Sequence, residues 1–175
     1  MIRILGIDPG SRITGYGIIE MRSNQAVCLS HGCFRLQQSS LAERLSHLHL
    51  QLTQLIKEYT PQEMAIESVF VHRNVDSALK LGQARGAAIA SVAIQSIPVH
   101  EYSPAEIKKS VVGRGNAAKQ QVQHMVQAIL GIHKAPQADA ADALAIALCH
   151  GHSRSLNNKL PSQVRTTRRR RWKSL

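Results

Sequence analysis

One stretch constrains the fold more than any other: residues 137–150, QADAADALAIALCH, are apolar nearly all round and yet carry two acids. The run of Ala, Leu and Ile predicts a buried helix. Asp139 and Asp142 are three residues apart, so both carboxylates lie on one face of that helix. Burying two like charges is costly unless a cation neutralises them. A metal site is one interpretation; a helix N-terminus is the other, and there Asp139 fits a cap better than Asp142 does.

Basic residues are concentrated in the second part of the chain. Residues 1–106 hold nine Lys/Arg against nine Asp/Glu, whereas residues 107–175 hold thirteen against two, and those two are Asp139 and Asp142. The net charge of +11 therefore belongs to the part that contains the acidic pair. This distribution predicts a polyanion-binding surface around an acidic centre, although charge alone does not separate nucleic acid from acidic lipid.

Length and composition narrow the class of protein. A chain of 175 residues fits one domain with a sizeable core, and it contains no run of eighteen apolar residues, so no membrane span is expected. The N-terminus reaches an acid too soon for a secretory signal. The three cysteines follow no pattern that would predict a disulfide framework or a zinc site. We expect a cytoplasmic protein.

The order of predicted elements indicates an α/β fold with a mixed five-stranded sheet flanked by helices. Strands are expected at residues 2–8, 14–19, 26–36, 64–67 and 97–101. Short turns make the first three an antiparallel meander, and Pro98 places the last at a sheet edge. Helices are expected at residues 41–59, from Asp76 or Ser77 to about 95, after Ser103, at 117–130 and at the acidic stretch.

The end of the acidic helix sets the expected domain boundary. His150 followed by Gly151 is typical of a helix C-terminus. We therefore divide the chain into a folded domain, residues 1–151, and a basic tail, residues 152–175. The tail has no apolar periodicity and is too charged to pack, so we expect it to be disordered.

Four acids stand at the ends of predicted elements. Asp8 ends the first strand, Glu67 ends the fourth, and Asp139 and Asp142 open the last helix. If the two strands are parallel neighbours, their acids emerge side by side where α/β folds usually bind ligands. Oxygen ligands alone select Mg²⁺ or Mn²⁺. Two such ions about 3.5–4 Å apart cleave phosphodiesters, one activating water and one stabilising the leaving oxygen. A strand-ending acid is also often only a turn residue, so spacing leaves both interpretations open.

Three motifs resemble those of the RuvC family, which are bacterial Holliday-junction endonucleases with a ribonuclease H-like fold. The motifs are residues 6–17 (GIDPGSRITGYG), residues 65–67 with 76–86 (AIE and DSALKLGQARG) and residues 137–147 (QADAADALAIA). The resemblance covers residues 1 to about 150. It implies that two Mg²⁺ ions are held by four catalytic acids: Asp8, Glu67, Asp139 and Asp142.

The same resemblance implies a biological role and partners. It implies a homodimer that resolves four-way DNA junctions in recombination and repair by paired, symmetric, sequence-preferring nicks. The nicks would leave 5′-phosphate and 3′-hydroxyl ends, and the branch-migration proteins RuvA and RuvB would be partners. No membrane and no nucleotide cofactor are implied.

DNA contacts also follow from the resemblance. Phe70 matches the family's position for a ring that stacks on a base near the junction, although a loop Phe equally often packs in a core. Lys108 and Lys119 match lysines near the scissile phosphate. Weaker candidates for backbone contact or dimer packing are Arg73, Asn74 and Arg85.

Three other functions compete with this one. Residues 6–15 also resemble the first phosphate loop of actin-like sugar kinases, but such enzymes need two domains, and 175 residues cannot supply both. A non-catalytic nucleic-acid binder is disfavoured, because four converging acids repel phosphate unless metal fills them. A related nuclease that acts on another structured DNA or RNA is compatible with the same residues.

Overall fold

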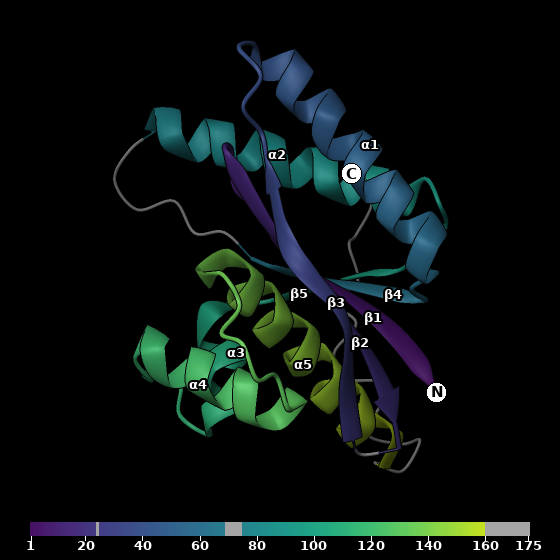
Figure 1. Cartoon of the computed structure of the whole chain (residues 1–175), viewed down its shortest axis with the longest axis vertical. Helices are drawn as coiled ribbons and strands as arrows, with labels where there is room; N and C mark the ends of the chain where they lie inside the picture. The colour runs from purple at the N-terminus through teal and green to yellow at the C-terminus, as the bar shows by residue number, and fades with distance from the viewer. Residues whose placement is uncertain (24, 69–74, 160–175) are drawn as a thin grey trace, which may run out of the picture.

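The centre of the molecule is a five-stranded mixed sheet with the order β3-β2-β1-β4-β5 (Figure 1). The computed structural model describes residues 1–23, 25–68 and 75–159, and the side chains up to residue 156. The strands are β1 Ile2–Asp8, β2 Ile13–Arg22, β3 Gln25–Arg35, β4 Glu63–Glu67 and β5 Val99–Tyr102. The helices are α1 Leu41–Tyr59, α2 Val75–Ala93, α3 Pro104–Val112, α4 Lys119–Leu130 and α5 Ala138–Lys159. The predicted α/β fold with a mixed five-stranded sheet is confirmed.

Helices cover both faces of the sheet. Figure 1 shows α1 and α2 on one side and α3, α4 and α5 on the other. Successive residues of β1 alternate between the two layers: Ile4 packs in the core cluster of α5, while Leu5 and Ile7 pack in the cluster of α1 and α2. A strand that is buried on both faces reads as a continuous run without polar side chains, as residues 4–7 (ILGI) do. No helix among the described residues is long and apolar enough to cross a membrane.

Strand pairing follows the sequence predictions. β1, β2 and β3 form the antiparallel meander, β1 pairs with β4 in parallel, and β5 is an edge strand beside β4. Two helices begin at the capping boxes that their sequences encode, Ser40 with Glu43 at α1 and Ser103 with Glu106 at α3. These local signals are reliable because each uses polar atoms of its own turn to satisfy free backbone N–H groups.

The predicted end of the acidic helix is wrong. α5 continues through Gly151 to Lys159, so the fold extends past the expected boundary at residue 151, and residues 152–159 are helical rather than disordered. Gly151 is buried and a Cβ there would lie 2.7 Å from the sulfur of Met21. This glycine therefore serves close packing against β2 and not the positive φ of a helix C-cap. Residues 160–175 of the expected tail lie outside the described residues.

Asp76, one of the two residues at which the second helix was expected to start or be capped, lies inside α2 instead. α2 begins at Val75, and Asp76 lies in its first turn, where its carboxylate pairs with Lys80 Nζ at 2.5 Å. Both side chains are exposed, so this pair contributes about 1 kcal/mol at most.

Glycines let α5 lie unusually close to the sheet. Gly6 of β1 pairs with Gly17 of β2, and both face α5. A Cβ at Gly6 would overlap the carbonyl oxygen of Ala143, and one at Gly17 would meet the Leu144 side chain at 2.7 Å. Any side chain at these positions would push the helix outward.

We expect Gly6→Ala to lower the free energy of unfolding by about 3 kcal/mol, because the added methyl overpacks against helix backbone that cannot turn aside. Urea unfolding followed by circular dichroism measures the loss. Gly115→Ala is the matched control, since its nearest neighbour would be 3.4 Å away, and it should change stability by less than about 0.5 kcal/mol. Equal effects of the two substitutions would contradict the close-packing role of Gly6.

Candidate active site

Two acids are brought together by the parallel pairing of β1 with β4. Ile7 stands opposite Ile66, so Asp8 and Glu67, the last residues of their strands, reach the same edge of the sheet. Strand alternation directs both toward the α5 layer, because Ile4 and Ala65 belong to the core cluster beneath that helix. The predicted meeting of Asp8 with Glu67 is thus present.

The first turns of α5 supply the other two acids. A Cβ at Gly15, the register partner of Asp8, would overlap the backbone oxygen of Asp139, so the helix start rests directly on β2. Carboxylate oxygens of Asp8, Asp139 and Asp142 lie within 4.8 Å of one another. The three aspartates form a compact cluster, and Glu67 lies close enough for its charge to act on Asp8.

Crowding of these charges changes their protonation. Burial, followed by the charges of Asp142, Glu67 and Asp139, raises the pKa of Asp8 to about 7. Burial and then the charge of Asp142 likewise raise the pKa of Glu67. Each added negative charge is poorly compensated, so the folded protein favours protons or cations at this point.

Two lysines border the acids. Lys119 Nζ contacts Asp142 Oδ2 at 2.5 Å, and the charge of Lys108 partly offsets the rise in the pKa of Glu67 that burial and Asp142 cause. Glu67, Asp142 and both lysines line an open pocket of about 270 Å³. The structure therefore places both predicted lysines beside the acids, and it does so from two different helices, α3 and α4.

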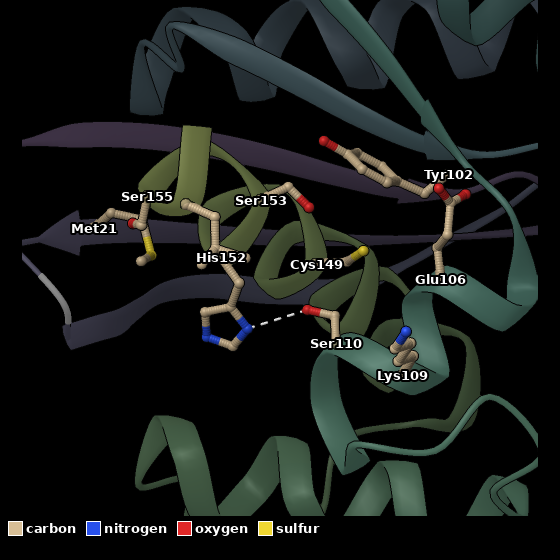
Figure 2. A pocket seen from close by; sticks show the side chains of 10 residues that line it. Met21, Tyr102, Glu106, Lys109, Ser110, Cys149, His152, Ser153 and Ser155 are labelled. Carbon is tan, nitrogen blue, oxygen red and sulfur yellow. Dashed lines mark hydrogen bonds between the residues drawn. The ribbon is translucent and has the colours of Figure 1, made fainter. Parts of the chain in front are cut away.

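A larger pocket, of about 720 Å³, lies elsewhere, along the C-terminal half of α5 (Figure 2). Figure 2 shows Cys149 and His152 of α5 facing Ser110 of α3, and the hydroxyl of Ser110 is 3.1 Å from His152 Nδ1. Burial raises the pKa of Cys149 to about 11, so the thiol is protonated at neutral pH and is a poor nucleophile. None of the four candidate acids lines this pocket, and we assign the chemistry to the smaller one.

Arg85 has a role that the motif alone did not reveal. It was expected to contact the DNA backbone or a dimer partner. In the structure its Nε donates to the carbonyl oxygen of Glu67 at 3.2 Å, and its Nη2 pairs with Glu101 at 2.6 Å. Arg85 thus fixes the end of β4, where Glu67 is placed. The other expected DNA contacts, Phe70, Arg73 and Asn74, lie outside the described residues.

The donor set suits a hard divalent cation. All four candidate side chains are carboxylates, three of them within 4.8 Å, and the raised pKa of Asp8 reflects the cost of its negative charge there. Oxygen-only sites favour Mg²⁺ and Mn²⁺ over softer ions. The residues present therefore fit a metal of this class.

The sequence profile of the family described as crossover junction endodeoxyribonuclease RuvC matches residues 4–150. The chain belongs to the RuvC family. It is 57% identical over 166 residues to the RuvC of Marinobacter nauticus, covering 95% of this chain and 93% of that one. It is 53% identical over 173 residues to the RuvC of Hahella chejuensis, covering 99% and 100%.

Solved structures share the fold. The Thermus thermophilus RuvC in complex with Holliday junction substrate superposes with a TM-score of 0.85 at 32% identity, covering 90% of this chain and 97% of that chain. The yeast mitochondrial Holliday junction resolvase Ydc2 superposes with a TM-score of 0.65 at 14% identity, covering 89% and 80%, which shows the fold alone. The predicted family and its ribonuclease H-like fold are confirmed.

The raised pKa of Asp8 predicts how stability depends on pH without metal. Between about pH 4 and pH 7 the folded state holds a proton that the unfolded chain releases, so the metal-free protein loses stability as pH rises. Asp8→Asn removes this penalty. We expect the variant to equal the wild type at about pH 4 and to exceed it by up to about 4 kcal/mol at about pH 8.

Urea unfolding in EDTA across this pH range measures the difference, with Asp76→Asn as a control outside the acid cluster. Excess Mg²⁺ should restore wild-type stability at high pH by neutralising the acids. An advantage of Asp8→Asn that does not vary with pH would contradict the electrostatic origin.

Proposed function

We propose that this chain resolves four-way DNA junctions by paired symmetric nicks, using two Mg²⁺ ions held by four catalytic acids: Asp8, Glu67, Asp139 and Asp142. The observation that carries the proposal is the convergence of these carboxylates in a chain of the RuvC family, with too little positive charge around them. The bound ions would activate the attacking water and stabilise the leaving oxygen, with Mn²⁺ as a substitute.

The chain's own residues would position the DNA strand. Lys119 and Lys108 line the acid pocket, where their charges would hold the scissile phosphate beside the acids. Once cations neutralise Asp142, the ammonium of Lys119 is released from its present ion pair and can turn to phosphate. Departure of the 3′-oxygen from phosphorus leaves a 3′-hydroxyl and a 5′-phosphate, which a ligase can seal.

The four acids provide the central test. We expect Asp8→Asn, Glu67→Gln, Asp139→Asn and Asp142→Asn each to slow Mg²⁺-dependent junction cleavage roughly a thousandfold, which corresponds to ~4 kcal/mol of lost transition-state stabilisation. Each amide keeps the shape of the side chain but removes a charge that holds metal. Junction binding should persist or tighten, since one fewer carboxylate repels phosphate.

Asp76→Asn is the matched control, because this aspartate is exposed and the other three aspartates of the sequence all belong to the acid cluster. It should cleave at nearly the wild-type rate under single-turnover conditions. Full activity of one amide variant would remove that residue from the site. Full activity of all four would overturn the two-metal proposal.

A homodimer is proposed on the evidence of α2. The first turns of this helix expose a stripe of apolar and small residues: Val75, Leu79, Gly82 and Gly86. Leu79 is 59% exposed and Val75 72%, and a Cβ at either glycine would meet nothing within 4 Å. Glycines at this spacing let a second helix approach closely, and a two-fold axis brings the same stripe from each protomer together. Two acid sites would then act on opposite strands of one junction.

Leu79→Glu should convert the dimer to a monomer, because it places two like charges at the centre of a self-complementary contact. Light scattering during size-exclusion chromatography measures the mass. Leu50→Glu is the control, since Leu50 is equally exposed, at 61%, on α1. A dimer that survives Leu79→Glu, or a wild type that is monomeric at micromolar concentration, would reject the α2 interface.

Further DNA contacts are proposed at Phe70, Arg73 and the basic tail. Residues 160–175 contain six Lys/Arg, and we propose that they add non-specific affinity for phosphate. Affinity for DNA falls as salt rises. Removing these residues, or replacing Lys108 or Lys119 by Ala, should make that fall less steep, by up to roughly 0.9 in the slope of log affinity against log salt per lost phosphate contact. An unchanged slope after removal of residues 160–175 would leave the tail without this role.

Phe70→Ala should leave the salt dependence unchanged while slowing junction cleavage, because an aromatic ring stacks on a base without pairing with phosphate.

A second candidate, cleavage of another branched DNA or of an RNA hybrid, shares the same acids. Comparing cleavage of a mobile four-way junction, a linear duplex and an RNA–DNA hybrid separates the two.

We propose that the protein acts in the bacterial cytoplasm together with RuvA and RuvB. Faster cleavage of junctions preloaded with those proteins would support this partnership, and an unchanged rate would contradict it.

A further inference from the structure

A second group of side chains that could hold a metal ion lies beside the middle of α5, away from the acids at the start of the helix. Glu63, His100 and His150 come from β4, β5 and α5, and one ligand atom of each lies within 4.8 Å of the others. Glu63 opens β4 while Glu67 closes it, a separation of about 13 Å along the strand. His150 follows Asp142 by eight residues, or about 12 Å along the helix. The two groups are therefore separate.

His150 is the centre of this group. It is only 3% exposed, and burial lowers its pKa, so the ring is neutral at pH 7. Its Nε2 contacts Glu63 Oε2 at 2.5 Å, and its Nδ1 contacts the Tyr102 hydroxyl at 2.7 Å. A neutral imidazole with a carboxylate at Nε2 and a fixed partner at Nδ1 has the arrangement of a metal-binding histidine supported by a second hydrogen bond.

The two oxygens of Glu63 have different partners. Oε1 accepts from Arg154 Nη1 at 3.0 Å, which fixes the carboxylate and leaves Oε2 directed at His150. The arginine therefore orients Glu63 rather than closing the site. For a cation to bind at Nε2, the proton of the neutral imidazole must lie on Nδ1, where it donates to the hydroxyl oxygen of Tyr102; the cation then takes the place between Oε2 and Nε2.

His100 completes the group from the edge strand. Its ring stacks on that of His150, with centroids 4.2 Å apart and planes 26° apart. It is half-buried, so the ring can turn about its side-chain torsions until a nitrogen points toward Glu63 and His150. Two imidazoles and one carboxylate would then converge, with a fourth position open to water.

We propose that Glu63, His100 and His150 form a second metal site that binds one Zn²⁺ ion per chain and clasps the edge strand β5 to β4 and α5. Mixed nitrogen and oxygen ligands of this number suit Zn²⁺, whereas Mg²⁺ prefers oxygen alone. The site does not depend on the function proposed for the acids.

Calorimetric titration of the untagged, full-length protein with Zn²⁺ in excess Mg²⁺ tests the proposal, because Mg²⁺ then occupies the acid site. We expect one equivalent of Zn²⁺ and a rise in melting temperature. Co²⁺ used as a probe should give the intense visible absorption of a four-coordinate ion.

Variants distinguish this site from other places where Zn²⁺ could bind. His100→Phe keeps a stacking ring and Glu63→Gln keeps the shape of the side chain, so both should fold; each should lower Zn²⁺ affinity roughly 100-fold or more. Tyr102→Phe removes only the supporting hydrogen bond and should lower it about 10–100-fold. His124→Phe, at an exposed position on α4, should leave the Zn²⁺ affinity unchanged. Asp142→Asn should still bind one Zn²⁺ ion per chain.

Three results would overturn the proposal. The first is that no Zn²⁺ ion binds in excess Mg²⁺, and the second is that one Zn²⁺ ion still binds with unchanged affinity in both His100→Phe and Glu63→Gln. The third is that Asp142→Asn loses the Zn²⁺ ion, which would place the ion among the acids.

Discussion

The close contact between α5 and the sheet is the constraint on which the active site depends. Gly6, Gly15 and Gly17 remove the side chains that would otherwise separate the helix from β1 and β2. The helix start then rests on the strand beside Asp8, and three carboxylates meet within 4.8 Å. Without this contact the acid of β1 and the acids of α5 would lie too far apart to share a cation. Dense packing here creates an electrostatic cost that a bound cation would relieve.

α5 carries a different chemistry at each end of its contact with the sheet. Its first turns contribute two carboxylates to the group that includes Asp8, with Glu67 nearby, whereas its later turns contribute His150 to the group that includes Glu63. Both glutamates lie on β4 and face the same helix, because residues 63, 65 and 67 share one side of the strand. A rigid helix and strand thus hold the two groups at a fixed separation, so that each can select its own class of ion.

Local signals were predictable because each is satisfied within a few residues. The capping boxes, the three-strand meander, the edge position of β5 and the acids at element ends all follow from short patterns. Gly151 shows the limit of such reasoning: a glycine after histidine usually ends a helix, but Met21 from a distant strand occupies the space that its missing side chain leaves. Arg85 is similar, since its two partners, Glu67 and Glu101, lie on strands far from it in sequence.

The sequence by itself determined the types of residue available for chemistry, the order of the elements and, through its motifs, the family. Those properties depend on side-chain identity and on short-range periodicity. Tertiary structure alone decided how far α5 runs, that Lys119 pairs with Asp142, and that Glu63, His100 and His150 meet. The last two are contacts between residues 23 to 87 positions apart, and they exist only because the sheet order and the glycine contacts bring the elements together.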